Sequence, residues 1–462
     1  MMRALLSIVL GLSPLCTGLT AQNLTAPLLA GSWQSTYHNP AMVHFLPQRV
    51  TLGLPGVAND LRLQNLQYGD LFVEENGRRV LDFMELARVA NEQNTVQDVY
   101  GIETLGLAVQ AGRLGLSIYH RLRAQGEAEY GRDLVELVAR GNAPFIGQTV
   151  ELAPRGQVIS FQEVGLGVSY ALSDKIAIGG RLKYLAGTSN IQVVNGGSLR
   201  LRTGAENYAL TLEQELTVNT SNALVYESLD SVSFDYNPSR LALGDLATGN
   251  TGLAFDLGVA VNLDRLRLTA SVVDLGASID WRDDITSLRF TGTDVFTGLD
   301  LLENLLRDTV SLETAVDSLL LTYEPERSSE GYTTEIGPSF YVGGEYDITD
   351  AFTTGAMLVL EDRLGKLQPA VVFMGRYAIT EWLRMGVNVN YRADIRTNVG
   401  LHLYATPGRV QIFASSDKFI TLLSTGNTSL AGVRLGLALA LGQRAGPLGR
   451  SRSSFASLPE YR

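Results

Sequence analysis

The stretch that decides the fold is LAFDLGVAVNL, residues 253–263. Every odd-numbered position in it holds a large apolar residue, whereas the even-numbered positions hold Ala254, Asp256, Gly258, Ala260 and Asn262. Successive side chains of a β-strand point to opposite faces of the sheet. We therefore expect a strand with one uniformly apolar face and one face of small and polar residues.

The same alternation recurs at residues 105–110, 385–391 and 435–441. The strands it predicts reach the roughly 9–11 residues that a tilted membrane strand needs, which is long for a soluble β-sandwich. A sandwich that turns its apolar face toward a core is the alternative. The second face mixes small and amide side chains, which suits the packed or wet lumen of a barrel. The pattern favours an all-β fold, an antiparallel transmembrane β-barrel.

Composition supports a barrel. The chain has 462 residues, 47 of them glycine, and 18% are charged, where a soluble domain carries about 25%. Its mean hydropathy is +0.08, and beyond the N-terminus no apolar run reaches the roughly 20 residues of a membrane helix. Since only helices and closed barrels satisfy their backbone in lipid, a membrane protein of this composition is expected to be a barrel. The net charge of −11 argues against a nucleic-acid partner.

A short repeat marks tight turns. The segment YALSD (170–174) recurs as YDITD (346–350) and YAITE (377–381), each followed by a glycine at the same offset. We interpret each copy as strand, turn, strand, with the Ser/Thr-Asp/Glu pair bonding to the turn backbone. The tyrosines, with Phe352 and Trp382, are expected to form an aromatic girdle at the membrane–water interface.

The strand count on this basis is about fourteen, an even number that leaves both chain ends on the periplasmic side. The strands are expected near residues 48–57, 99–111, 114–123, 157–171, 175–187, 250–262, 265–276, 332–347, 351–362, 368–379, 382–393, 396–405, 408–415 and 430–442. Residues 191–202 and 208–219 are placed as an external hairpin, and sixteen strands are the alternative. The barrel is thus predicted over 48–442, followed by a disordered tail over 443–462.

Helices are expected in the external loops. Residues 297–321 carry apolar side chains at mostly helical spacing, after a capping box formed by Thr297 and Asp300. Shorter stripes lie at 80–90 and 134–138. These apolar faces either pack over the barrel mouth or line an entry groove for an apolar ligand.

The N-terminus is typical of an exported protein. Arg3, the apolar run 4–12 and Leu19-Thr20-Ala21 predict a cleaved signal peptide over residues 1–21. An uncleaved anchor and a lipoprotein signal at Cys16 are the alternatives. Cys16 is the only cysteine, so the mature chain is expected to have no disulfide and no cysteine-bound metal.

We find no catalytic signature, and we predict neither enzyme activity nor a cofactor. There is no Walker-type loop and no Gly-x-Ser-x-Gly elbow. The histidines His38, His44, His120 and His402 show no metal-ligand spacing, so no metal site is expected. The acidic cluster 280–284 is interpreted as a solvated loop.

The segment before the first strand carries a family resemblance. It contains Asn39-Pro40-Ala41, and Pro40 biases Asn39 toward an extended shape. Here the chain resembles the FadL-like outer-membrane transporters, in which such a segment belongs to an N-terminal hatch. The tripeptide also occurs in barrels associated with type IX secretion. The stretches 162–170 and 179–187 are similar to an uncharacterised Bacteroidota outer-membrane barrel family, usually grouped with the FadL-like superfamily.

The resemblance implies a hatch over residues 22–47, with Asn39, Pro40 and Ala41 as its residues, and release of solute by movement of the hatch or by a strand kink. It implies uptake of small hydrophobic compounds across the cell outer membrane of a Gram-negative bacterium. The implied partners are outer-membrane lipid, a small hydrophobic ligand and the barrel-assembly machinery. A non-transporting structural or type IX secretion-associated barrel is the alternative.

Overall fold

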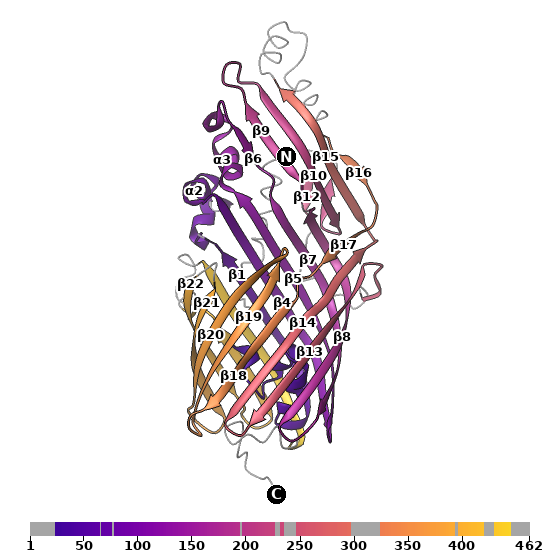
Figure 1. Cartoon of the computed structure of the whole chain (residues 1–462), viewed down its shortest axis with the longest axis vertical. Coiled ribbons are helices and arrows are strands. Elements are labelled where there is room, and N and C mark those ends of the chain that lie inside the picture. The colour runs from indigo at the N-terminus through magenta and orange to yellow at the C-terminus, as the bar shows by residue number, and fades with distance from the viewer. Residues whose placement is uncertain are drawn as a thin grey trace.

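The alternating segments pair as antiparallel strands and close into a barrel (Figure 1). The computed structural model describes residues 24–64, 66–75, 78–194, 196–226, 232–234, 246–296, 324–392, 396–419 and 429–444. The barrel has fourteen strands, as expected, and it closes where β1 pairs with both β24 and β4. They are β1 (Gln48–Leu63), β4 (Gln93–Ala111), β5 (Leu114–Gly131), β7 (Arg155–Ala171), β8 (Ile176–Val193), β13 (Thr251–Leu263), β14 (Leu266–Trp281), β18 (Ser339–Asp347), β19 (Phe352–Arg363), β20 (Lys366–Ala378), β21 (Leu383–Arg392), β22 (Arg396–Ala405), β23 (Val410–Ser416) and β24 (Leu430–Arg444).

Several predicted strand ends were wrong. β1 and β4 extend well beyond the predicted residues 48–57 and 99–111, because their polar outer halves still pair with each other above the apolar region. The predicted strand 332–347 is two strands, since Pro338 has no N–H to donate to a ladder. The last strand continues to Arg444 rather than ending at 442.

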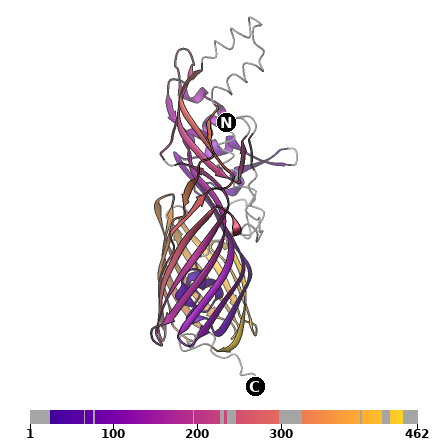
Figure 2. The same ribbon diagram turned by 90° about the vertical axis from the view of Figure 1, so that its right-hand side faces the viewer.

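Beyond one rim the strands continue as a twisted sheet (Figures 1 and 2). It adds β6 (Thr149–Glu151), β9 (Ser198–Thr203), β10 (Leu210–Ser221), β15 (Ile285–Phe296), β16 (Glu326–Ser328) and β17 (Tyr332–Glu335). β9 and β10 pair as a hairpin in this sheet. The predicted external hairpin is therefore confirmed except at residues 191–193, which belong to β8, and the sixteen-strand alternative is wrong. Two small hairpins, β2 (Phe72–Glu75) with β3 (Arg78–Leu81) and β11 (Leu224–Tyr226) with β12 (Val232–Phe234), lie outside the barrel ladder.

The external sheet has its own apolar core, covered by α2 (Phe83–Val89) and α3 (Arg132–Arg140). Leu86, Leu134 and Leu137 are buried in this core. The described helices therefore pack their apolar faces inward, as in the first of the two alternatives. The expected stripe at 80–90 starts too early, because Val80 lies in β3. The predicted helix at 297–321 lies outside the described residues. Short 3-10 helices η5 (Tyr68–Leu71) and η6 (Ala143–Phe145) complete this region.

The repeated motif forms tight turns, as predicted. Each copy joins neighbouring barrel strands, namely β7 to β8, β18 to β19 and β20 to β21. The Ser173 hydroxyl accepts hydrogen bonds from the next turn amides, and those of Thr349 and Thr380 do the same. The hydroxyl member of each pair therefore fixes the turn.

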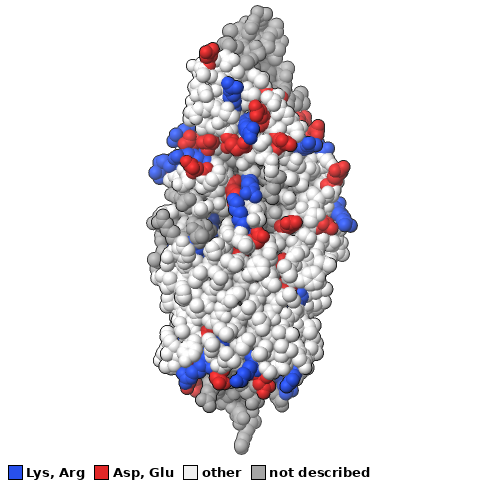
Figure 3. Space-filling model, in the orientation of Figure 1, with Lys and Arg blue, Asp and Glu red and all other residues white. Residues whose placement is uncertain are grey.

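On the face drawn in Figure 3, the barrel carries a broad belt with few charged residues between two regions rich in them. Its exposed side chains include Leu107, Leu166, Phe255, Leu257, Val342, Phe373, Val387 and Leu437. Tyr170, Tyr346, Tyr377 and Trp382 are exposed beside the tight turns, where the girdle was expected. The alternate residues Ala254, Asp256 and Ala260 are fully buried. Among the described residues, no helix is long and apolar enough to cross a membrane.

A charge placed in this belt will destabilise the barrel. Leu257 is 54% exposed in the belt, whereas Val295 is 64% exposed in the external sheet. We expect Leu257→Arg to lower the free energy of unfolding in lipid vesicles by about 2–4 kcal/mol. Val295→Arg, which leaves an arginine in water, is expected to change it by less than about 0.5 kcal/mol. Equal effects in urea unfolding would contradict the assignment of the belt to lipid.

Candidate functional site

The lumen of the barrel is occupied by the chain's own N-terminal segment (Figure 2). This segment, residues 24–47, is buried at every position and contains η2 (Ala26–Leu28), η3 (Trp33–Tyr37) and η4 (Pro40–Phe45). η2 contacts β18 and β19, η3 contacts β24, and η4 contacts β7, β8 and β13. We call residues 24–47 the luminal segment.

Trp33 of the luminal segment lies against a pair of glycines. Gly53 of β1 and Gly106 of β4 are direct cross-strand partners. A Cβ atom added to Gly53 would lie 2.3 Å from the Trp33 Cε2, and one added to Gly106 would lie 2.2 Å from its Cζ2. No side chain larger than hydrogen fits beneath this indole ring. Trp33 is fully buried and donates a hydrogen bond to the Tyr37 hydroxyl at 3.1 Å.

Asn39, Pro40 and Ala41 lie against a second glycine pair, formed by Gly179 of β8 and Gly258 of β13. Asn39 is extended, with φ −150° and ψ 113°, and its side-chain oxygen accepts a hydrogen bond from the Ala41 amide, which caps η4. Its side-chain amide donates to the carbonyls of Val259 and Ala270, at 3.0 and 3.3 Å. The tripeptide therefore joins the segment to the wall.

Wall side chains satisfy the backbone of the luminal segment from several sides. Arg181 of β8 donates to the carbonyls of Thr36 and Tyr37, at 2.6 and 3.4 Å. Further bonds come from Gln110, Ser271, Tyr404, Gln411 and Asp417. Since buried backbone groups need partners, these polar wall residues allow an irregular segment to lie inside the barrel.

Arg181 belongs to a buried ion-pair network on the inner wall. Its partner Asp256 lies 3.0 Å away and also binds Lys183, whose Nζ is 2.8 Å from Asp274. Arg123 joins Asp274 to Glu163, at 2.9 and 3.0 Å, and Arg121 completes the set at 2.9 Å from Glu163. Charges removed from water need this kind of mutual pairing.

Asp274 lies where β14 is kinked. The residues Asp274 and Gly276 have positive φ angles of 61° and 65°. The β14–β18 ladder stops at Val273, and β14 pairs again, with β17, only from Ser278. The register against β13 also shifts in this region. The barrel wall is therefore irregular over residues 274–277.

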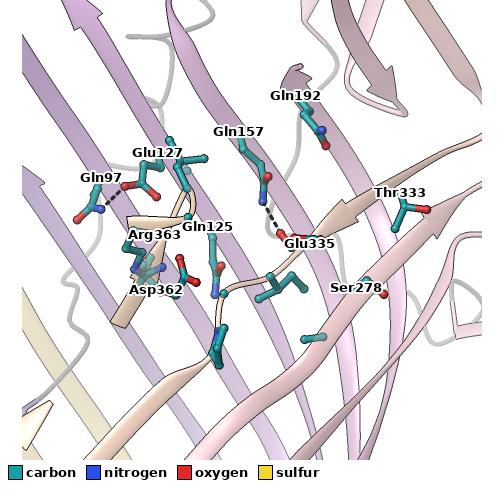
Figure 4. Close-up of a pocket in the computed structure, with 18 of the residues that line it drawn as sticks. Gln97, Gln125, Glu127, Gln157, Gln192, Ser278, Thr333, Glu335, Asp362 and Arg363 are labelled. Carbon is teal, nitrogen blue, oxygen red and sulfur yellow. Dashed lines mark hydrogen bonds between the residues drawn. The ribbon is translucent and has the colours of Figure 1, made fainter. Parts of the chain in front are cut away.

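A polar cavity of about 590 Å³ adjoins the kink (Figure 4). One side is formed by β4, β5, β7 and β8, the second by the kink and β17, and the third by the turn between β19 and β20. That turn is tied to the opposite strands, because Lys366 binds Glu129 at 2.7 Å and Arg155 donates to the Leu364 carbonyl at 3.4 Å. A smaller cavity of about 90 Å³ extends from here to Tyr37 and His38 of the luminal segment.

Sequence reasoning missed most of this site. It singled out Asn39, Pro40 and Ala41, but not Trp33, Arg181 or the glycine pairs. The available signal was the presence of charged residues such as Arg181 and Lys183 at positions that alternate with apolar residues in a strand.

Two of the histidines lie in the luminal segment. His38 contacts Arg434 at 2.9 Å, and His44 lies beside Gly115. No group of metal-binding residues occurs in the described part of the chain.

These features define a class of protein, a 14-strand transmembrane β-barrel whose lumen is filled by its own N-terminal segment. The chain belongs to the family described as "Family of unknown function (DUF5723)", whose model matches residues 40–417. No curated protein matches the sequence.

Solved structures similar to this chain include a FadL homologue and two toluene transporters, all at low sequence identity. A Pseudomonas aeruginosa FadL homologue is 11% identical over 92% of this chain and 99% of its own, with a TM-score of 0.44. The Pseudomonas putida toluene transporter TodX is 10% identical over 91% and 97%, with a TM-score of 0.42. The Ralstonia pickettii toluene transporter TbuX is 11% identical over 91% and 98%, with a TM-score of 0.41.

The glycine pair beneath Trp33 gives a testable contact. We expect Gly106→Val to displace the indole ring and to speed hydrogen exchange of the amides at 33–37 by about tenfold or more, as expected for a loss of roughly 1.4 kcal/mol or more of local stability. Gly101→Val on the same strand is the control, because an added Cβ there would lie 3.6 Å from its nearest neighbour. Unchanged exchange in Gly106→Val would contradict the packing.

Proposed function

We propose that the chain is an outer-membrane channel for small compounds, held closed by the luminal segment acting as a hatch. The observation that carries the proposal is the occupied lumen. A purely structural barrel needs no segment fitted to glycine pairs and bonded to wall residues that are available only inside. The kink at 274–277 and the adjoining cavity supply an irregular part of the wall where a solute can enter.

The proposal includes the domain organisation inferred from the sequence. Residues 1–21 would be removed as a signal peptide, 22–47 would form the hatch, 48–444 the barrel and 445–462 a periplasmic tail. The assembly machinery of the outer membrane of a Gram-negative bacterium would insert the barrel. Membership of an uncharacterised Bacteroidota group within the FadL-like superfamily is part of the same proposal.

Small hydrophobic compounds are the solutes that the FadL-like resemblance suggests. The similar toluene transporters TodX and TbuX make toluene the natural probe. Faster entry of labelled toluene into Gram-negative cells that contain the chain than into cells that lack it would support this class of solute. Equal entry into both kinds of cell would exclude hydrocarbons as the solute without excluding a channel.

Loosening the hatch should open the channel. Arg181→Met removes two donors to the luminal segment but leaves Asp256 paired with Lys183. We expect single-channel conductance in planar bilayers to rise several-fold over the wild-type protein. Arg376→Met is the control, because this buried arginine pairs with Glu345, 3.0 Å away.

Two outcomes would count against the channel. If both variants and the wild-type protein conduct no more than lipid alone, the alternative of a non-transporting or type IX secretion-associated barrel is favoured. If Arg376→Met conducts as strongly as Arg181→Met, a general loss of wall structure explains the current, and the hatch contacts do not control it.

A further inference from the structure

The cavity beside the kink has a lining that differs from a hydrocarbon site. Four glutamines reach it from four different strands (Figure 4), namely Gln97, Gln125, Gln157 and Gln192. Hydroxyl side chains come from Ser278 and Thr333, and charged ones from Glu127, Glu335, Asp362 and Arg363. Each amide offers both donors and an acceptor, so the wall presents a dense set of both kinds.

Part of this hydrogen-bonding capacity is unused within the described residues. The Asp362 Oδ1 is buried and has no hydrogen-bond partner among them. Gln97 donates to Glu127, and Gln157 donates to the Glu335 carbonyl at 3.4 Å. The side chain of Gln125 lines the cavity between these pairs and makes no hydrogen bond to another described side chain or backbone group. Unpaired polar groups in such a place favour a ligand that pairs with them.

The lining discriminates between classes of solute. A hydrocarbon would leave the Gln125 amide and the Asp362 Oδ1 without partners, which is unfavourable. An anion would meet the carboxylates of Glu127 and Asp362. A simple cation would satisfy those carboxylates but not the N–H groups of the Gln125 amide. A neutral molecule rich in hydroxyl groups satisfies all of them, because each hydroxyl both donates and accepts.

We propose that this cavity binds a saccharide and that a saccharide is the solute of the channel. This inference rests on the proposed function. A volume of about 590 Å³ falls within the roughly 300–1,000 Å³ of small-molecule sites. The smaller cavity of about 90 Å³ shares Gln125 with this one and is lined by Tyr37 and His38, so it connects the saccharide site to the residues that hold the lumen closed.

The test is binding of maltose to the full-length protein in detergent, measured by saturation-transfer NMR. We expect binding by the wild-type protein and about tenfold weaker binding by Gln125→Leu, which keeps the size but removes the amide. Gln125→Asn, which keeps an amide on a shorter stem, should be intermediate. The control is Gln148→Leu, at an exposed position away from the cavity lining, which should bind like the wild-type protein.

Competing probes decide the chemical class. Spermidine and toluene should not displace maltose, and displacement by either, or equal binding by Gln125→Leu, would overturn the saccharide site. A saccharide could reach the cavity as a free solute or as part of lipopolysaccharide, and adding lipopolysaccharide in place of maltose distinguishes these two sources. Binding of maltose supports a free solute, and binding of lipopolysaccharide alone overturns transport of a free saccharide.

Flux through Arg181→Met separates this inference from the proposed function. Ion current without maltose binding would overturn the saccharide site but would still support the proposed channel. Maltose binding without any ion current would support the saccharide site but would count against the proposed channel. Maltose flux in liposome-swelling experiments, reduced by adding Gln125→Leu, would support both.

Discussion

The close approach of the luminal segment to the barrel wall sets the conditions for the rest of the structure. At two places where it lies close, the wall presents paired glycines, Gly53 with Gly106 and Gly179 with Gly258. A larger side chain at these positions would overlap with Trp33, Asn39 or Pro40. Because the inner positions of a strand alternate with the outer ones, this requirement also fixes which residues face lipid.

Filling the lumen changes the electrostatics of the inner wall. Charges that would face water in an open barrel are instead buried, and they are stable only when paired. Arg181, Lys183, Asp256 and Asp274 are accordingly linked in one network, and Arg181 extends it to the segment itself. Removing one partner of such a buried pair costs about 3–5 kcal/mol. The same network ends at the kink, so that the wall irregularity and the closed lumen share residues.

The sequence predicted the parts of this architecture that depend on local pattern. The alternation at 253–263 predicted the two faces of β13. The repeat at 170–174 and its two further copies predicted three tight turns between barrel strands. Both signals lie within a few neighbouring residues. The sequence did not predict the glycine pairs, since Gly53 and Gly106 meet only through the register of two strands. The kink was equally hidden, because it lies where β14 changes its pairing from β18 to β17, and both of these strands are distant in sequence.

The most direct test of the occupied lumen is disulfide formation between the segment and the wall. Ala41 and Ala260 belong to one buried cluster, whereas Leu257 on the same strand faces outward. With Cys16 replaced by serine, oxidation of the membrane-inserted protein should cross-link Ala41→Cys with Ala260→Cys, detected by mass spectrometry. The pair Ala41→Cys with Leu257→Cys should stay reduced. Failure of the first pair to form, or equal formation of both, would contradict a segment docked inside the barrel.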